Sequence, residues 1–204
     1  MVSSGLRLQR RLPYVVVLST LLFLALQVSP SPSPVEMTLL DVDEDAVLAM
    51  ARVVDNAQPG GIISININSL GGHTYEVLRL LAVSEMAHDK GVTVICTVQG
   101  LAASAAAMFF IAGCDRRLIK DHAYLMLHES SISKPLILGP VTPEEIQSNA
   151  NLNEAISTVV ARACKMPVEE YRKKVKAGSW MITAQEAVAN GMADVVLPGR
   201  GSVP

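Results

Sequence analysis

Two apolar, β-branched runs in the first half of the chain each lead through a turn into a helical segment. This order constrains the fold more than any other feature. Residues 62–67 form the first run, which ends in the turn 68–72 before a helix expected over 74–90. Residues 92–98 form the second run, before a helix of small residues expected over 102–112. Strands that alternate with helices predict a parallel sheet with right-handed crossovers, and therefore an α/β fold.

The rest of the chain carries clear helix-start signals. Acidic residues 41–45 can cap a helix. Thr142 precedes Pro143, and proline is favoured at the first helical position. Thr183 and Glu186 have the spacing of a capping box. Helices are therefore expected from 45 to about 57, over 142–164, from 167 onward and over 183–191, and strands at Val35–Leu39, Arg117–Lys120, Ala123–Leu127 and Asp194–Leu197.

Length and composition limit the classes of protein. The 204 residues suffice for one domain with a hydrophobic core. A net charge of -2 gives no basic footprint, so nucleic acid is not an implied partner. Cys96, Cys114 and Cys164 are widely spaced and odd in number. They predict neither a metal site nor a disulfide framework, and we expect small buried apolar side chains. No cofactor is implied.

The N-terminal segment differs from the body. Three arginines precede an uncharged apolar run over 14–28, and Ser-Pro repeats follow over 29–34. A basic start before a short apolar run is typical of a signal peptide, and a full membrane span needs roughly 20 residues. We therefore divide the chain into a signal or anchor segment with its linker, 1–34, and one domain, 35–204. Export or membrane anchoring is expected. The alternative is a buried strand or a misassigned start in a cytoplasmic protein.

Three positions are suited to chemistry. Ser104 stands in an alanine run where a helix is expected to begin, and the helix dipole there favours a developing oxyanion. His128 closes an apolar strand and could serve as the base that serine attack on a carbonyl requires. Gly71 and Gly72 let the backbone turn sharply and present N–H groups to a ligand. Each has a structural alternative: a helix-packing serine, a structural histidine and a tight turn.

Together these segments resemble the Clp protease proteolytic subunit. Residues 68–72, Asn-Ser-Leu-Gly-Gly, resemble the family's Asn-Ser-Pro-Gly-Gly. Residues 100–104, Gly-Leu-Ala-Ala-Ser, resemble its nucleophile motif Gly-Met-Ala-Ala-Ser, and residues 126–128, Met-Leu-His, resemble the Met-Ile-His that carries the base. Residues 180–187, followed by 191–194, resemble its closing segment. The resemblance implies the ClpP/crotonase-like spiral of βαβ units with a protruding handle helix.

The resemblance also implies roles for individual residues. Ser104 would attack the peptide carbonyl, and His128 would take its proton and return it to the leaving amine. The N–H groups of Gly71 and Ala105 would form the oxyanion hole. The helix over 142–164 would be the handle through which homo-oligomeric rings stack. Peptides or unfolded proteins would be the substrates, with an ATPase unfoldase as partner if the protein is cytoplasmic.

The sequence departs from the family at the third member of the triad. The family has an aspartate just before the closing segment, and this position falls on Gly178 or Ser179. Glu129 adjoins His128, but neighbours on a strand point to opposite faces. The third residue is therefore unknown. The site is a Ser-His dyad, recruits an acid from elsewhere, or belongs to a weak or inactive subunit. The N-terminal segment resembles instead the membrane-associated signal peptide peptidase branch. An acyl-CoA enzyme and a membrane-anchored scaffold are the remaining alternatives.

Overall fold

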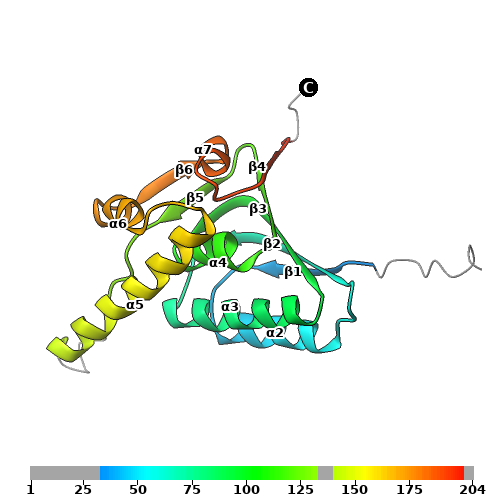
Figure 1. Cartoon of the computed structure of the whole chain (residues 1–204), viewed down its shortest axis with the longest axis horizontal. Coiled ribbons are helices and arrows are strands. Elements are labelled where there is room, and N and C mark those ends of the chain that lie inside the picture. The colour runs from blue at the N-terminus through cyan, green and yellow to red at the C-terminus, as the bar shows by residue number, and fades with distance from the viewer. Residues whose placement is uncertain (1–32, 133–139, 200–204) are drawn as a thin grey trace, which may run out of the picture. The chain divides into compact units, whose positions relative to one another are not determined.

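The computed structural model describes residues 33–132 and 140–199, and these form the predicted α/β domain (Figure 1). The predicted signal or anchor segment therefore lies outside the described residues, apart from the last two residues of its linker. The strands are β1 (Val35–Leu39), β2 (Ile62–Ser69), β3 (Thr93–Ala103), β4 (Arg116–Lys120), β5 (Tyr124–Leu127), β6 (Trp180–Thr183) and β7 (Val195–Leu197). The helices are α2 (Glu44–Asn56), α3 (Thr74–Asp89), α4 (Ala105–Gly113), α5 (Pro143–Ala163), α6 (Val168–Lys176) and α7 (Ala184–Ala189).

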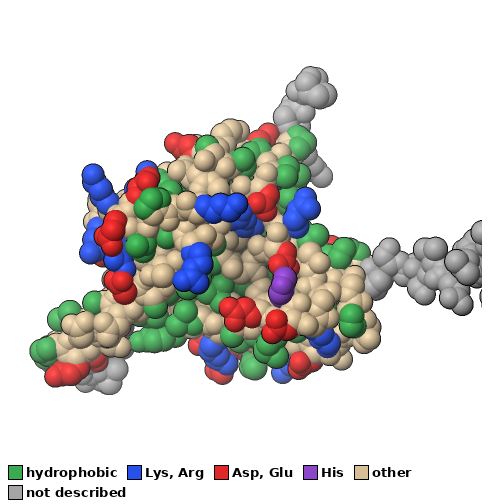
Figure 2. Space-filling view, viewed as in Figure 1, with side chains coloured by type: hydrophobic (Ala, Val, Ile, Leu, Met, Phe, Trp, Pro, Cys, Tyr) green, Lys and Arg blue, Asp and Glu red, His purple; other side chains and the backbone are tan. Residues whose placement is uncertain are grey.

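Over the described residues the strands form one seven-stranded sheet. The order β1-β2-β3-β4-β7 is parallel throughout, as the alternation of strands and helices predicted. β5 lies off this path and pairs parallel with the end of β3, while β6 pairs antiparallel with β5. Helix α5 extends away from the sheet (Figure 1), where the sequence predicted a protruding handle. In the view of Figure 2, acidic and basic side chains are interspersed over the surface.

The core lies between the sheet and helices α2, α3 and α4. Ile63, Ile65 and Ile67 of β2 are buried, and so are Val94 and Val98 of β3. Helix α4 is buried along almost its whole length, because its small residues allow close packing against the sheet and α3. The central strands therefore bury one face against these helices, while the alternate residues on the other face are only partly buried.

The helix starts follow the predicted capping signals. Asp43 accepts a hydrogen bond from Ala46 N–H at the start of α2. Thr142 and Thr183 each form a complete capping box, with Glu145 and Glu186 respectively. The start of α4 differs from prediction, because residues 102 and 103 continue β3 and pair with β5. Pairing with a second strand overrides the helix propensity of these alanines.

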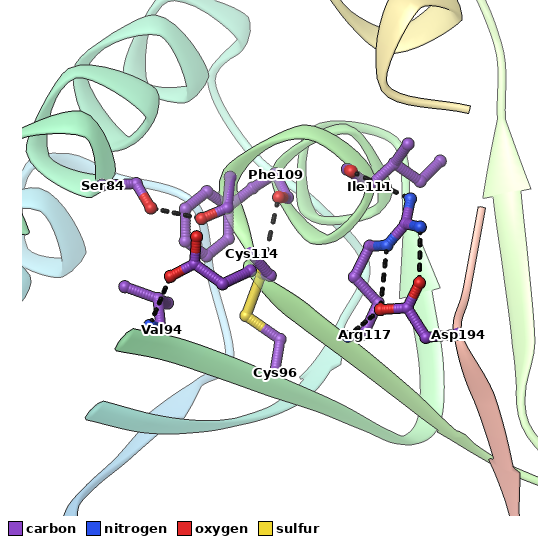
Figure 3. Close-up of a disulfide and its surroundings, with 10 residues drawn as sticks. Ser84, Val94, Cys96, Phe109, Ile111, Cys114, Arg117 and Asp194 are labelled. Atoms are coloured by element: carbon purple, nitrogen blue, oxygen red, sulfur yellow. Dashed lines mark hydrogen bonds and ion pairs between the residues drawn. A yellow bond between two sulfur atoms is a disulfide. The ribbon is translucent and has the colours of Figure 1, made fainter. Parts of the chain in front are cut away.

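One prediction about the cysteines is wrong, because Cys96 and Cys114 form a disulfide (Figure 3). Cys96 lies in β3, and Cys114 follows the helix that returns the chain past the same strand. Asp115 holds this return in place, since its N–H donates to Val94 O at 2.9 Å and its carboxylate accepts from Val94 N–H. No local pattern indicates this proximity, because a separation of 18 residues brings two cysteines together only through the β3–α4 geometry. Cys164 is free and buried as expected, and burial raises the pKa of its thiol.

Reduction of this disulfide is expected to destabilise the domain. In the chain-entropy model a loop of this length contributes about 3 kcal/mol. Each kcal/mol shifts the Tm of a domain of this size by about 2–4 °C, so we expect a decrease of about 6–12 °C. Thermal unfolding with and without a thiol-free reductant measures it. The double variant Cys96→Ala/Cys114→Ala should melt early and not respond to the reductant. A reductant-insensitive wild-type Tm would contradict the prediction.

An ion pair fastens the last strand to the sheet beside this disulfide (Figure 3). Arg117 Nη2 lies 2.7 Å from Asp194 Oδ1, and Arg117 Nη1 also donates to Gly191 O. Burial alone would raise the pKa of Asp194, but the hydrogen bonds and charge of Arg117 outweigh it and hold that pKa below its usual value. Asp194 is thus structural, since it joins β7 to β4.

No helix within 33–132 or 140–199 combines the length and hydropathy that crossing a membrane would need.

Candidate active site

Ser104 occupies a sharp turn between β3 and α4. Its backbone has φ 53° and ψ −124°, in the positive-φ region that residues other than glycine rarely adopt. Ser104 is the N-cap residue of α4, yet its hydroxyl makes no capping hydrogen bond. The turn therefore places the hydroxyl at the positive end of the helix dipole and leaves it available for another partner.

That partner is His128. The Nε2 of His128 lies 2.9 Å from Ser104 Oγ, within hydrogen-bond distance. The β3–β5 pairing brings them together, because Leu101, Ala102 and Ala103 pair in register with Tyr124, Leu125 and Met126. Ser104 N–H then donates to Met126 O at 2.7 Å. The two side chains, 24 positions apart in sequence, meet at the ends of adjacent strands. This is the nucleophile-base geometry of serine hydrolases.

The glycine turn after β2 lies against the same point. A Cβ on Gly71 would sit 2.8 Å from Ser104 Cβ and 3.2 Å from Ala105 N, so the backbones of the two turns are in close contact. In the described part of the chain, Ala105 N–H has no hydrogen-bond partner. Gly71 N–H, in contrast, donates to the buried Ser69 Oγ at 3.1 Å. The neighbouring Gly72 N–H, to which the resemblance gave no place in the oxyanion hole, makes no hydrogen bond to any described residue.

Gly71→Ala is expected to lower peptide hydrolysis by about 100- to 1000-fold, the typical cost of losing an oxyanion donor. Gly71 has φ +111°, and the added methyl group would press on Ala103 O and reach the Ala105 amide. Gly60→Ala is the matched control, because Gly60 also has positive φ but a Cβ there meets nothing within 4 Å. Hydrolysis rates and Tm are measured for both variants. Equal rates in the two would contradict this role for the Gly71 turn.

The pairing of β5 with β6 distinguishes the two candidates for the third triad position. The antiparallel register matches Leu127 with Trp180, so one further step sets His128 opposite Ser179 and Glu129 opposite Gly178. Directly opposed residues of an antiparallel pair share one face of the sheet. Continued by this one step, the register would put Ser179, and not Gly178, on the His128 side. Glu129 lies 4.0 Å from Lys176 in an ion pair. The residues that the structure describes form no cluster of histidine, cysteine or acidic side chains able to hold a metal ion.

A cleft of about 600 Å³ lies between the Gly72 turn and helix α5. Gly72 and Tyr75 line one side, and residues 130–132 and Leu152 line the other. The segment that follows His128 therefore forms one wall of the cleft. This cleft is large enough to receive several residues of an extended chain.

The parallel sheet and the strand–turn–helix unit at Ser104 define an α/β domain of the ClpP-like class, and comparison with known proteins agrees. The Clp protease family model matches residues 40–200. The ATP-dependent Clp protease proteolytic subunit of Porphyromonas gingivalis is 31% identical over 162 residues, covering 77% of this chain and 69% of that protein. The subunit of Bacteroides thetaiotaomicron is 31% identical over 160 residues, covering 77% and 70%. This chain belongs to the Clp protease family.

A solved structure supports the fold independently. A ClpP1 mutant from Listeria monocytogenes superposes with a TM-score of 0.65 at 18% identity, over 82% of this chain and 92% of that one. At this identity the likeness speaks for the fold alone. The predicted ClpP-like fold is thereby confirmed, and family membership implies a peptidase.

Proposed function

We propose that this domain is a serine-type endopeptidase that works through the Ser104–His128 pair. The observation that carries the proposal is the 2.9 Å contact between His128 Nε2 and Ser104 Oγ at the head of α4. Ser104 attacks the peptide carbonyl while His128 takes the hydroxyl proton. The C–N bond then breaks as His128 gives that proton to the leaving amine, and an acyl-enzyme remains. Water, activated by the same imidazole, releases the acid and restores Ser104.

The oxyanion of each tetrahedral intermediate would receive hydrogen bonds from Ala105 N–H and from the Gly71–Gly72 turn. Gly71 N–H was the expected second donor, but it must leave Ser69 Oγ to act. Gly72 N–H has no such competing acceptor among the described residues and is the readier donor. Either way the stabilising dipoles belong to the backbone, so they are fixed before the substrate arrives.

A fluorophosphonate probe tests this proposal directly. Such probes react rapidly with a serine hydroxyl that a base and an oxyanion hole activate, and far more slowly with a serine that lacks this activation. We expect the folded full chain to be labelled, and peptide mass spectrometry to locate the label on Ser104 rather than on another serine. A folded protein that stays unlabelled, or that is labelled elsewhere, would contradict the proposal.

An inactive subunit is the second candidate, because Gly178 or Ser179 stands where the family has an aspartate. This alternative predicts assembly with other subunits but no labelling of Ser104. The same probe therefore separates the two functions, provided that the assembly state is recorded in parallel by light scattering.

We infer that copies of this chain assemble into homo-oligomeric rings, and that two rings stack through the handle α5. Ile146, near the start of that helix, is 58% exposed and has the apolar character of a contact residue. Peptides or unfolded chains would be the substrates, and an ATPase unfoldase would be the partner in a cytoplasmic setting. Size-exclusion chromatography with light scattering tests the assembly, and Ile146→Asp should shift it from stacked rings toward single rings.

Export or membrane anchoring remains our proposal for localisation. The Cys96–Cys114 disulfide supports it, since such bonds form and persist in oxidising compartments. Fractionation of cells that express the chain with and without residues 1–34 tests it. Equal distribution of the two forms would argue for the cytoplasmic alternative.

A further inference from the structure

Ser130, two residues after His128, is held by two asparagines of the handle helix. Asn153 Oδ1 accepts from Ser130 N–H at 2.9 Å, and Asn153 Nδ2 donates to Ser130 O at 3.1 Å. Asn149 Nδ2 donates to the same carbonyl at 2.9 Å. Ser130 Oγ lies 3.1 Å from Asn149 Oδ1 and 2.9 Å from Asn153 Oδ1, and its single proton can serve either acceptor. We call Ser130, Asn149 and Asn153 the amide clamp.

The two asparagines are suited to this task by their spacing. Four positions apart on a helix, Asn149 and Asn153 present their amides on the same face. Both are half-buried, so their polar groups need partners, and Ser130 supplies a donor, an acceptor and a hydroxyl. Asparagine is a poor helix former, so two of them on this face weaken α5 locally. The presence of Asn149 and Asn153 is therefore not explained by helix formation, but it is explained by their hydrogen bonds to Ser130.

The clamp bears directly on the imidazole. His128 follows β5, whose pairing with β3 and β6 fixes the chain on its upstream side. On the downstream side the described contacts of the next two residues are the Glu129–Lys176 ion pair at 4.0 Å and the amide clamp. A long ion pair between partly exposed groups holds geometry weakly. The clamp is thus the firm anchor downstream of His128.

We propose that Asn149 and Asn153 are positioning residues, which hold the His128 imidazole on Ser104 and couple its orientation to the handle helix. This inference rests on the proposed hydrolytic function. Catalytic groups are sensitive to such support, since a misplacement of about 1 Å can cost roughly 100-fold in rate. A shift of α5 along its axis, such as contact with another subunit would cause, moves the clamp and hence the base.

The double variant Asn149→Ala/Asn153→Ala tests the proposal in the full chain. We expect fluorophosphonate labelling of Ser104 to slow by about 10- to 100-fold. Asn151→Ala is the matched control, because Asn151 lies exposed on the same helix and its side chain accepts a hydrogen bond from Gln147 and makes no contact with Ser130 in the described structure. This variant should label at the wild-type rate. Asn153→Asp keeps the acceptor contacts and loses one donor, so its labelling rate should lie between those of the wild type and the double variant. This variant replaces the double variant if the latter does not fold.

A cycle with His128→Ala separates positioning from general damage. If the clamp acts through the imidazole, its removal slows labelling in the wild-type background but not in the His128→Ala background. An equal loss in both backgrounds, or wild-type labelling in the clamp variant, would overturn the proposal.

A readout without catalysis keeps the two proposals distinguishable. In full chain labelled with ¹⁵N-histidine, the ring nitrogen resonances of His128 should move in the clamp variant and stay in place in Asn151→Ala. If the wild-type protein never reacts with the probe, the proposed hydrolytic function is wrong. The His128 resonances alone would then test whether the clamp positions the imidazole. Unchanged His128 resonances in the clamp variant would overturn it.

Discussion

Ser179→Asp is expected to raise peptide hydrolysis by about 100- to 10,000-fold. Extended one step beyond the Leu127–Trp180 pair, the β5–β6 register would set Ser179 opposite His128 on the same face, where a carboxylate could accept the Nδ1 proton of the imidazole. Such a group fixes the tautomer and stabilises the imidazolium, and its removal from a serine protease costs on the order of 10⁴ in kcat. A fluorogenic peptide and purified protein suffice for the measurement.

Ser179→Asn is the matched control for that gain. It has nearly the same shape as aspartate but lacks the charge, so it should remain close to wild type. If Ser179→Asp is no faster than Ser179→Asn, then this position does not reach the imidazole, and the extension of the register by one step is wrong.

Ser104→Ala is expected to slow hydrolysis strongly, with a loss whose size depends on residue 179. In a serine protease the nucleophile and base act as a unit worth on the order of 10⁶ in kcat, while the acid alone accounts for about 10⁴. The wild-type chain, with Ser179, should therefore lose only about 100-fold. In the Ser179→Asp background the same substitution should cost about 10⁴- to 10⁶-fold.

His128→Ala should match Ser104→Ala in both backgrounds, and the double variant should be no slower than either single one. Circular dichroism and Tm establish that the variants fold. Additive losses, or a Ser104→Ala protein as fast as its parent, would show that hydrolysis occurs elsewhere.

Much of the fold could be predicted because local signals agreed with the tertiary structure. Three local patterns form the structure that they predict. The isoleucines of β2 form a strand, Thr142 and Thr183 begin helices with capping boxes, and the glycine pair after β2 forms a turn. The Ser104–His128 pairing was predicted because the motif order resembled a known family. Their distance follows from the β3–β5 pairing, which no local pattern specifies.

What could not be predicted depends on contacts distant in sequence. The disulfide, the extension of β3 and the strand β6 each require knowledge of a partner segment. The choice between Gly178 and Ser179 was open for the same reason, since it needs the β5–β6 register. The amide clamp was missed because asparagines on a long helix give no signal until the loop beside them is placed.

The disulfide has a mechanical consequence. Cys96 and Cys114 bracket Ser104, so the covalent ring contains the end of β3, the nucleophile and all of α4. Force applied to the two ends of the chain is transmitted through the disulfide, so the segment between Cys96 and Cys114 carries none of it. With a sequence separation of 18, the oxidised chain stretches out shorter by roughly 60 Å than the reduced one. A molecular motor that pulls on either terminus could extend the rest of the domain. The segment between Cys96 and Cys114 would stay closed by the disulfide until a reductant opened it.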